Sequence, residues 1–217
     1  MALTSVFTIG HSTHTLPDFQ ALLRRHNLTA ICDVRSMPFS RTNPQFNREN
    51  LKTSLSAVGM VYVFLGAELG ARSKDPECYV DGRVQYDRLA RTELFRKGID
   101  RIRDGTREHR IALMCAEKDP LQCHRTILVA RHLDEAGIAV EHIREDGRLE
   151  SHDEALSRLL AMLKLSTDDM FRSRREVIED AYRLQGGRIA YVTKEVGSKA
   201  ATSPNDDLHN RLYKEIR

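Results

Sequence analysis

The feature that most constrains the fold is a regular alternation of short apolar, β-rich segments with amphipathic segments of helical spacing. Such alternation predicts an α/β fold in which helices cover both faces of a mostly parallel sheet of about five strands. We therefore expect a Rossmann-like three-layer arrangement with right-handed crossovers and a C-terminal helical appendage. The predicted strands cover residues 5–9, 28–34, 60–65, 111–114 and 140–143. The first predicted helix begins at Pro17. The other predicted helices cover residues 48–58, 85–104, 123–136 and 151–163.

Local signals mark where several of these elements begin and end. Thr15 or Leu16 is expected to cap the first helix, and Asn47 is expected to cap the second. Ser151 with a Glu three residues later matches a capping box, and Gly137 is a common helix stop. Residues 71–83 are polar and contain Pro76 and Gly82, which is typical of a surface loop.

The alternation ends after Leu165. Residues 167–169 can cap a helix that runs to about Leu184 and ends at the Gly186-Gly187 pair, and 188–192 can form one more strand or an extended segment. The residues that follow are polar, so we expect them to be loose. We divide the chain into an α/β domain, a C-terminal helix with a short extended segment, and a flexible tail, with boundaries 1–165, 166–196 and 197–217.

Composition excludes several classes of protein. The net charge of +3 over 217 residues is too small to indicate nucleic-acid binding by itself. No apolar run is long enough for a membrane helix, and the N-terminus lacks the pattern of a secretory signal. The cysteines are too few for a disulfide scaffold, which favours a reducing, cytoplasmic setting. They are Cys32, Cys78, Cys115 and Cys123.

Chemically reactive residues concentrate between a predicted strand and a predicted helix. Cys115 and Glu117 follow the strand, and Cys123, His124 and Arg125 stand at the expected helix start. Unpaired N–H groups and the helix dipole favour anions there and lower the pKa of a cysteine. The segment therefore predicts a site for anion binding or thiol chemistry.

Two other predicted strand ends carry polar residues, and the carboxyl ends of parallel strands share one edge of the sheet. Catalytic roles are predicted for both thiols, as nucleophiles, and for a carboxylate and an imidazole that move protons. The guanidinium groups are expected to hold the anion, although each can instead pair internally, Arg35 with Asp33 and Arg125 with Glu117. Cys123 can likewise be a buried small residue. The predicted catalytic residues are Cys123, Cys115, Glu117 and His11, and the predicted substrate-binding residues are Arg35, Arg125, Ser12, Asp33, Ser40 and His124.

Several familiar sites do not match this pattern. The chain has no P-loop and no dinucleotide fingerprint, and Leu121 and Val129 occupy the arginine positions that a cysteine-phosphatase loop would need. Zinc ligands can be chosen from Cys115, Cys123, His124 and His11, but their spacing is not that of common zinc sites. Adjacent Cys and His also seldom reach one ion comfortably. We therefore predict no metal, and the sequence names no cofactor.

The motifs at these strand ends resemble the proteins grouped as domain of unknown function family 488. The resemblance covers roughly residues 6–191, and its sharpest block is Cys-x-Glu followed by Cys-His-Arg. It implies an α/β fold and no established reaction. Ala71 departs from the pattern, since similar proteins often have a further Gly there. The matching segments are 8–12, 33–35 with Pro38 and Ser40, 65–66, 69–70, 113–117, 123–125, 142–143, 146–147 and 179–186.

Three functions agree with these residues. The preferred one is an enzyme whose cysteine and arginine groups act on a small anionic substrate, phosphorylated or nucleotide-like. The second is a regulatory module that binds a nucleotide or nucleic acid without covalent chemistry. The third is a thiol redox sensor that forms a reversible Cys115–Cys123 disulfide. No membrane partner is expected, and the oligomeric state is left open.

Overall fold

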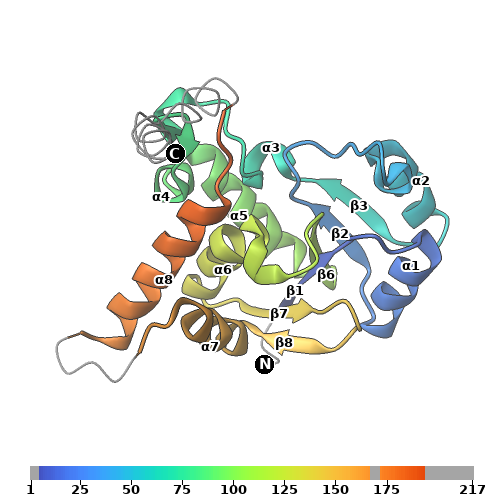
Figure 1. The fold of residues 1–217 in the computed structure, drawn as a ribbon. Coiled ribbons are helices and arrows are strands. Elements are labelled where there is room, and N and C mark those ends of the chain that lie inside the picture. The colour runs from blue at the N-terminus through green and yellow to red at the C-terminus, as the bar shows by residue number, and fades with distance from the viewer. Residues whose placement is uncertain (1–4, 167–171, 194–217) are drawn as a thin grey trace, which may run out of the picture.

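The computed structural model describes residues 5–166 and 172–193, and its centre is a six-stranded sheet with the order β3-β2-β6-β1-β7-β8 (Figure 1). Five strands are parallel, and β8 pairs antiparallel with β7 at one edge. The predicted mostly parallel α/β sheet is confirmed, and β8 is the short edge strand that the pattern did not predict. The strands are β1 (Ser5–Gly10), β2 (Ala30–Asp33), β3 (Val61–Phe64), β6 (Ile111–Cys115), β7 (Ala139–Ile143) and β8 (Leu149–Ser151).

Alternate side chains of the strands enter two separate cores, which gives the predicted three layers. Phe7 and Met114 point to the face covered by α1 (Leu16–Arg25) and α2 (Arg48–Ser56). Leu113 and Cys115 point to the opposite face, which is covered by α5 (Glu93–Gly105) and α6 (Arg131–Glu135). Cys115 is thus placed on the α5 side by the two-residue period of its strand.

Two of the predicted helix caps are confirmed, and a third is wrong. Thr15 caps α1 by accepting a hydrogen bond from the N–H of Asp18. Ser151 forms the expected capping box at the start of α7 (His152–Leu163). Asn47 precedes α2, but its side chain does not cap that helix; its Oδ1 accepts from the N–H of Ser40 at 2.6 Å. The Asn47 amide therefore closes the preceding loop instead.

The predicted helix over residues 85–104 is two helices, α4 (Tyr86–Ala90) and α5. Thr92 separates them, because its hydroxyl accepts from the N–H of Phe95 and so starts a new helix. Residues 71–83 form a surface loop only in part. They contain the 3₁₀-helix η2 (Pro76–Cys78) and join the hairpin of β4 (Tyr79–Val80) and β5 (Arg83–Val84), and the Cys78 side chain is buried.

The predicted helix over residues 123–136 begins one residue later, at His124, and its first part is π-helical. The 3₁₀-helix η3 (Pro120–Gln122) comes first, and Cys123 then has extended backbone with φ −139° and ψ 141°. A π-helical segment, η4 (Arg125–Ala130), follows and continues into α6. Gly137 ends α6 with a φ of 77°, as predicted. π-Helical turns are rare and often lie at functional sites.

The C-terminal helix α8 (Arg174–Ile189) begins and ends later than predicted. Ser173 caps it, and the helix continues through Gly186, whose missing side chain leaves room for the Tyr86 ring. The helix covers the first residues of the strand expected over 188–192, and only a single bridge from Val192 to Arg83 remains. The cap predicted at 167–169 and the tail at 197–217 lie outside the described residues.

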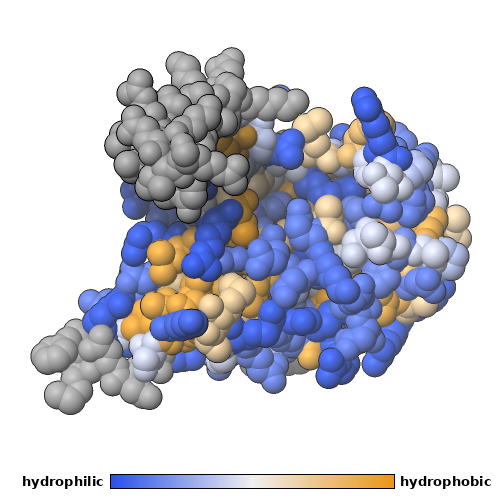
Figure 2. Space-filling model, viewed as in Figure 1, coloured by the Kyte–Doolittle hydropathy of each residue, from blue (hydrophilic) through white to orange (hydrophobic). Residues whose placement is uncertain are grey.

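The helix α8 packs along α7 and against η3, where Leu121, Leu159 and Tyr182 belong to a third apolar cluster (Figure 1). In the view of Figure 2, apolar residues gather over α7 and α8, whereas polar residues cover most of the remaining face. Among the helices that the structure describes, none has the length and apolar character needed to cross a membrane. The remaining short elements are η1 (Pro44–Phe46) and α3 (Gly66–Leu69).

Candidate functional site

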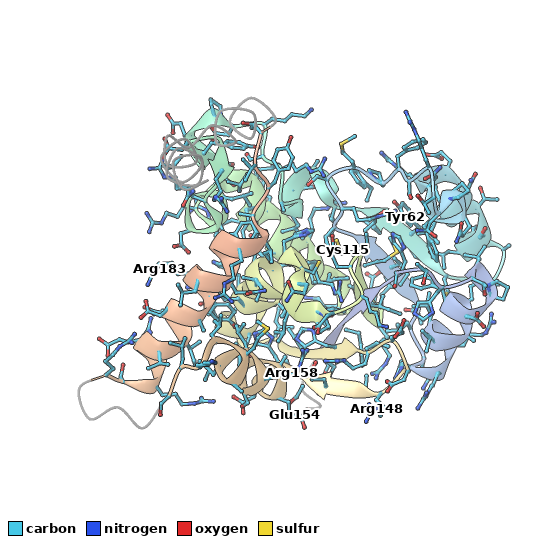
Figure 3. All side chains as sticks on the ribbon, in the orientation of Figure 1. Tyr62, Cys115, Arg148, Glu154, Arg158 and Arg183 are labelled. Atoms are coloured by element: carbon cyan, nitrogen blue, oxygen red, sulfur yellow. The ribbon has the colours of Figure 1, made fainter. Side chains whose placement is uncertain are left out.

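The carboxyl ends of β1, β2 and β6 meet at one edge of the sheet. Backbone hydrogen bonds continue there between the segment that follows β1 and the end of β6 with the loop after it. The N–H of His11 donates to the carbonyl of Cys115 at 2.9 Å, and the N–H of Ser12 donates to that of Ala116 at 3.0 Å. A Cβ on Gly10 would lie 1.9 Å from the carbonyl oxygen of Glu117. The strand end therefore needs glycine, because the loop after β6 lies directly on it. Figure 3 labels Cys115, which lies near the middle of the molecule.

A cavity of about 280 Å³ opens at this edge. Both cysteines line it although Cys123 is only 1% exposed and Cys115 only 3%. The two residues are thus shielded from bulk water, and polar groups surround them. The cavity wall comes from five parts of the chain: residues 35–37, residues 71–72, Tyr86, the segment 115–124, and residues 189–191 at and after the end of α8. The lining residues are Arg35, Ser36, Met37, Ala71, Arg72, Tyr86, Cys115, Ala116, Glu117, Gln122, Cys123, His124, Ile189 and Tyr191.

Polar groups surround the Cys123 sulfur. The thiol donates to Oε2 of Glu117 at 3.0 Å, and the sulfur accepts from the N–H of Arg125 at 3.4 Å. Nδ1 of His124 lies 3.8 Å from this sulfur and 3.8 Å from the sulfur of Cys115. One imidazole nitrogen therefore faces both thiols.

The other nitrogen of His124 fixes the ring. Its Nε2 lies 3.0 Å from the backbone carbonyl of Val34, which can only accept, so Nε2 carries a hydrogen. In the neutral ring Nδ1 then has a free lone pair directed at the sulfurs. The carbonyl of Val34 thus selects the tautomer that can accept a thiol proton.

The surroundings shift the pKa values of these groups in opposite directions. Burial raises the pKa of the Cys123 thiol, but a hydrogen bond from Cys115, the charge of Arg125 and the contact with His124 outweigh it and lower the pKa. The pKa of Cys115 is raised, by its hydrogen bond to Cys123 and by burial. The pKa of Glu117 is raised by burial and by negative charge on Cys123. Cys123 is therefore the thiol that ionises first, and its neighbours hold protons.

Arg125 lies beneath the loop and outside the cavity lining. Its guanidinium is fully buried and donates to the carbonyls of Glu117 at 2.7 Å and Lys118 at 3.2 Å. Within the described part of the chain its Nε has no hydrogen-bond partner. The side chain holds the loop in shape, and its predicted contact with an anion stays a prediction.

Arg35 lines the cavity, yet most of its donors are used internally. It donates to both carboxylate oxygens of Asp33, at 2.9 and 2.6 Å, and to the carbonyl of Phe46. Tyr62 also donates to Asp33, at 2.7 Å. The ion pair that the sequence left as an alternative for Arg35 is the arrangement in the structure. A hydrogen bond from the Arg35 guanidinium to a substrate anion is still a prediction.

The remaining predicted residues lie beside the cavity rather than in its wall. Nδ1 of His11 donates to the carbonyl of Ser12, and its Nε2 accepts from Arg35. Burial and the charge of Arg35 lower the pKa of His11 to about 4, so the ring is neutral at physiological pH. The Ser40 hydroxyl accepts from the N–H of Asn43 and closes a turn. Of the ten predicted residues, the cavity wall contains Arg35, Cys115, Glu117, Cys123 and His124.

The sequence did not point to several other residues of the wall. The Arg72 guanidinium lies over the Tyr191 ring at 4.5 Å, and Tyr86 closes another side. Arg72 comes from a polar loop, Tyr191 from the residues after α8, and Tyr86 from α4. No periodicity or spacing brings them together, because their contacts depend on the tertiary fold.

One feature of the wall bears on the expectation about metals. The donor atoms of Cys115, Cys123 and His124 all lie within 4.8 Å of one another, which is close enough for one ion. Adjacency of Cys and His seldom lets both residues reach one ion, but it does not keep the donor atoms of Cys123 and His124 apart here. The predicted absence of a metal stays a prediction.

Comparison with known proteins gives one match. Residues 15–132, more than half of the chain, match the family described as domain of unknown function DUF488. No curated protein and no solved structure is detectably similar to the chain. The resemblance seen in the motifs is thereby confirmed.

Proposed function

Because the chain belongs to the DUF488 family, whose description names no reaction, we propose a function from the site itself. The protein is an enzyme in which Cys123 attacks a small anionic substrate, phosphorylated or nucleotide-like. The observation that carries this proposal is that Cys123 lines a cavity while its sulfur contacts Glu117, His124 and a backbone N–H. A nucleophilic thiol beside an imidazole and a carboxylate is the arrangement that covalent catalysis needs.

The proposed step can be written for a phosphate monoester. A lone pair of the Cys123 thiolate forms an S–P bond while the bond from phosphorus to the leaving oxygen breaks. The leaving oxygen takes the proton of the Glu117 carboxyl group. Water then gives a proton back to Glu117 and attacks phosphorus, the S–P bond breaks, and inorganic phosphate leaves. The thiolate and the protonated carboxyl are restored.

The wall of the cavity supports an anionic substrate with an uncharged part. Arg72 is exposed and has no ion pair with a carboxylate among the described residues, so its guanidinium can accept an anion. Tyr86, Tyr191 and Met37 supply aromatic and apolar surface beside it. Arg72 thus joins Arg35 and Arg125, which the sequence predicts, as a candidate to bind the anion.

Two alkylating reagents test the proposal, because iodoacetamide is neutral and iodoacetate is anionic. At neutral pH and limiting reagent, peptide mapping should find Cys123 modified on the order of tenfold faster than Cys32 and Cys78, since the thiolate is the reactive form. Cys123→Ser should remove this fast modification. Arg72→Gln should slow the reaction with iodoacetate and leave that with iodoacetamide unchanged.

The matched control for Arg72→Gln is Lys74→Gln, which removes an exposed cation of the same loop that does not line the cavity. Inorganic phosphate should protect Cys123 in the wild type. Equal labelling of all four cysteines would refute the nucleophile, and equal effects of the two charge removals would refute the anion site.

A second candidate function rests on the closeness of the two sulfurs, which lie within 4.8 Å. Oxidation by a peroxide would join Cys115 and Cys123 as a disulfide, while the peroxide takes up two electrons and two protons and leaves as two waters. Mass spectrometry after mild peroxide treatment should then show the Cys115–Cys123 cross-link. Sulfenic acid on Cys123 without a cross-link would reject this candidate.

A further inference from the structure

We propose that Cys115, Cys123 and His124 form a binding site for a thiophilic divalent cation of the zinc class. The three donor atoms come from the end of β6 and from the extended residue and helix start that follow η3. The atoms lie within 4.8 Å of one another, and the three residues line one cavity. An ion at this point would be reached from the cavity and bound by the protein on its other side.

The distances fit a tetrahedral ion. With Zn–S of about 2.3 Å and Zn–N of about 2.0 Å, a tetrahedral sulfur and nitrogen lie about 3.5 Å apart, and two sulfurs about 3.8 Å apart. Nδ1 of His124 is 3.8 Å from each of the two sulfurs. Each sulfur–nitrogen distance would shorten by about 0.3 Å, and the two sulfurs, which lie within 4.8 Å of each other, would adjust to the tetrahedral separation.

The surroundings of His124 match those of a metal ligand. Metal-binding imidazoles usually donate their second N–H to a carbonyl or carboxylate, which fixes the tautomer and the ring orientation. Here Nε2 donates to the carbonyl of Val34 at 3.0 Å, and this leaves the lone pair of Nδ1 directed at the sulfurs. The orientation is thus in place before an ion binds.

The donor set selects the kind of cation. Two sulfurs and one imidazole favour zinc-class ions over magnesium or calcium, which prefer oxygen. Two thiolates would neutralise a divalent charge in this buried position, and binding would release the thiol protons. Glu117, with Oε2 at 3.0 Å from the Cys123 sulfur, lies outside this group of three donors, and its carboxylate could accept from a water bound to the ion.

The cation and the proposed reaction would exclude each other. A lone pair of Cys123 that binds the ion is not available for attack, so the loaded protein would be inactive. This regulatory consequence rests on the proposed function, whereas binding of the cation does not. The two ideas can therefore fail separately.

Cobalt is a direct probe of the site, because Co²⁺ bound to thiolate in a tetrahedral site absorbs strongly in the near ultraviolet and the visible. The full chain, reduced and freed of metal with a chelator, is titrated with Co²⁺ and then with Zn²⁺. We expect a thiolate-to-cobalt band that saturates at one equivalent and disappears when Zn²⁺ displaces the probe. Loss of one ligand should weaken binding at least about tenfold.

The ligand variants are Cys115→Ser and His124→Gln, and the glutamine amide can still donate to the carbonyl of Val34. The matched control is Cys78→Ser, a buried cysteine outside the cavity. Circular dichroism checks that each variant is folded. Weak binding in both ligand variants with normal binding in Cys78→Ser supports the site. Absence of the band in the wild type, or an unchanged band in the ligand variants, overturns it.

Alkylation separates this proposal from the proposed function. Bound Zn²⁺ should protect Cys123 from iodoacetamide. Fast alkylation of the metal-free protein that Zn²⁺ does not slow would refute the cation site and leave the nucleophile. A cobalt band together with an inert Cys123 in the metal-free protein would refute the nucleophile and leave the cation site.

Discussion

A chain of four buried side chains joins the sheet to the C-terminal helix, and it predicts that acid destabilises the protein. Thr8 Oγ1 lies 2.8 Å from Nδ1 of His142, and Nε2 of His142 lies 3.1 Å from Nδ1 of His152. Nε2 of His152 lies 2.8 Å from the hydroxyl of Tyr182 on α8. This row of side chains passes from β1 through β7 and α7 to α8, so the protonation of its histidines affects how firmly these elements pack together.

The contact between the two rings can hold only one hydrogen. That hydrogen belongs to either His142 or His152, so the two rings cannot both carry a second proton at once. Burial, the neighbouring His152 and three arginines lower the pKa of His142. Burial also lowers the pKa of His152, although nearby carboxylates partly oppose it; they are Asp134, Asp153 and Glu135. Both rings are therefore neutral in the folded protein.

The sign of the pH effect follows from these lowered pKa values. Below a pH of about 6.5 an unfolded histidine binds a proton that the folded ring does not, so the free energy of unfolding falls as pH falls. For a ring that stays neutral in the fold, the loss between pH 7 and pH 5 is about 2 kcal/mol. The two rings together can lose up to about 4 kcal/mol, a large part of the stability of a typical domain.

Urea unfolding followed by circular dichroism at pH 7, 6 and 5 measures this loss, since the chain has no tryptophan for fluorescence. His152→Gln should reduce the loss on going from pH 7 to pH 5 by up to about 2 kcal/mol. His109→Gln is the control, because His109 is partly exposed and lies outside this chain. A wild type and His152→Gln that lose the same free energy between pH 7 and 5 would refute the argument.

Three further predictions concern single contacts. Gly10→Ala should lower the free energy of unfolding measured in urea by at least about 2 kcal/mol, because the loop carbonyl of Glu117 must move, and it should slow alkylation of Cys123. The control is Gly187→Ala in α8, which has open space around it and should change stability little. Ser151→Ala should cost about 1 kcal/mol in the same assay, as loss of a helix cap does. Tyr62→Phe should cost about 1.5–3 kcal/mol, since Asp33 loses a charge-assisted hydrogen bond; an unchanged unfolding midpoint would contradict this.

The periodicity of apolar residues was sufficient to predict the architecture, because each strand and helix is marked by residues that lie close together in the sequence. The alternation of apolar segments such as 111–114 with amphipathic segments predicts the parallel sheet, and Ser151 and Gly137 mark helix ends by backbone chemistry alone. The pattern placed one helix start a residue early, because Cys123 has extended backbone and its carbonyl accepts the first hydrogen bonds of the helix, from the N–H groups of Thr126 and Ile127. No periodicity in the sequence distinguishes the π-helical turns that follow from an ordinary helix.

The candidate site was predictable to the extent that strand ends determine it. Cys115 and Arg35 follow parallel strands, so the fold alone brings them to one edge. Arg125 shows the limit of residue type as a guide. A guanidinium beside a cysteine suggests an anion site, but this one is buried under the loop, and its partners are carbonyl groups that any sequence would supply.

The cavity also depends on parts of the chain outside the segment that matches the family. Ile189 and Tyr191 form part of its wall, and the carbonyl of Tyr191 accepts from the N–H of Val84 at 3.0 Å. Gln185 on α8 donates to the carbonyl of Leu121, two residues before Cys123. The thiols thus come from the matched segment, whereas the cavity wall is completed by α8 and the residues after it. If the proposed function holds, substrate choice would vary through this part of the wall without any change in the thiols, the carboxylate or the imidazole.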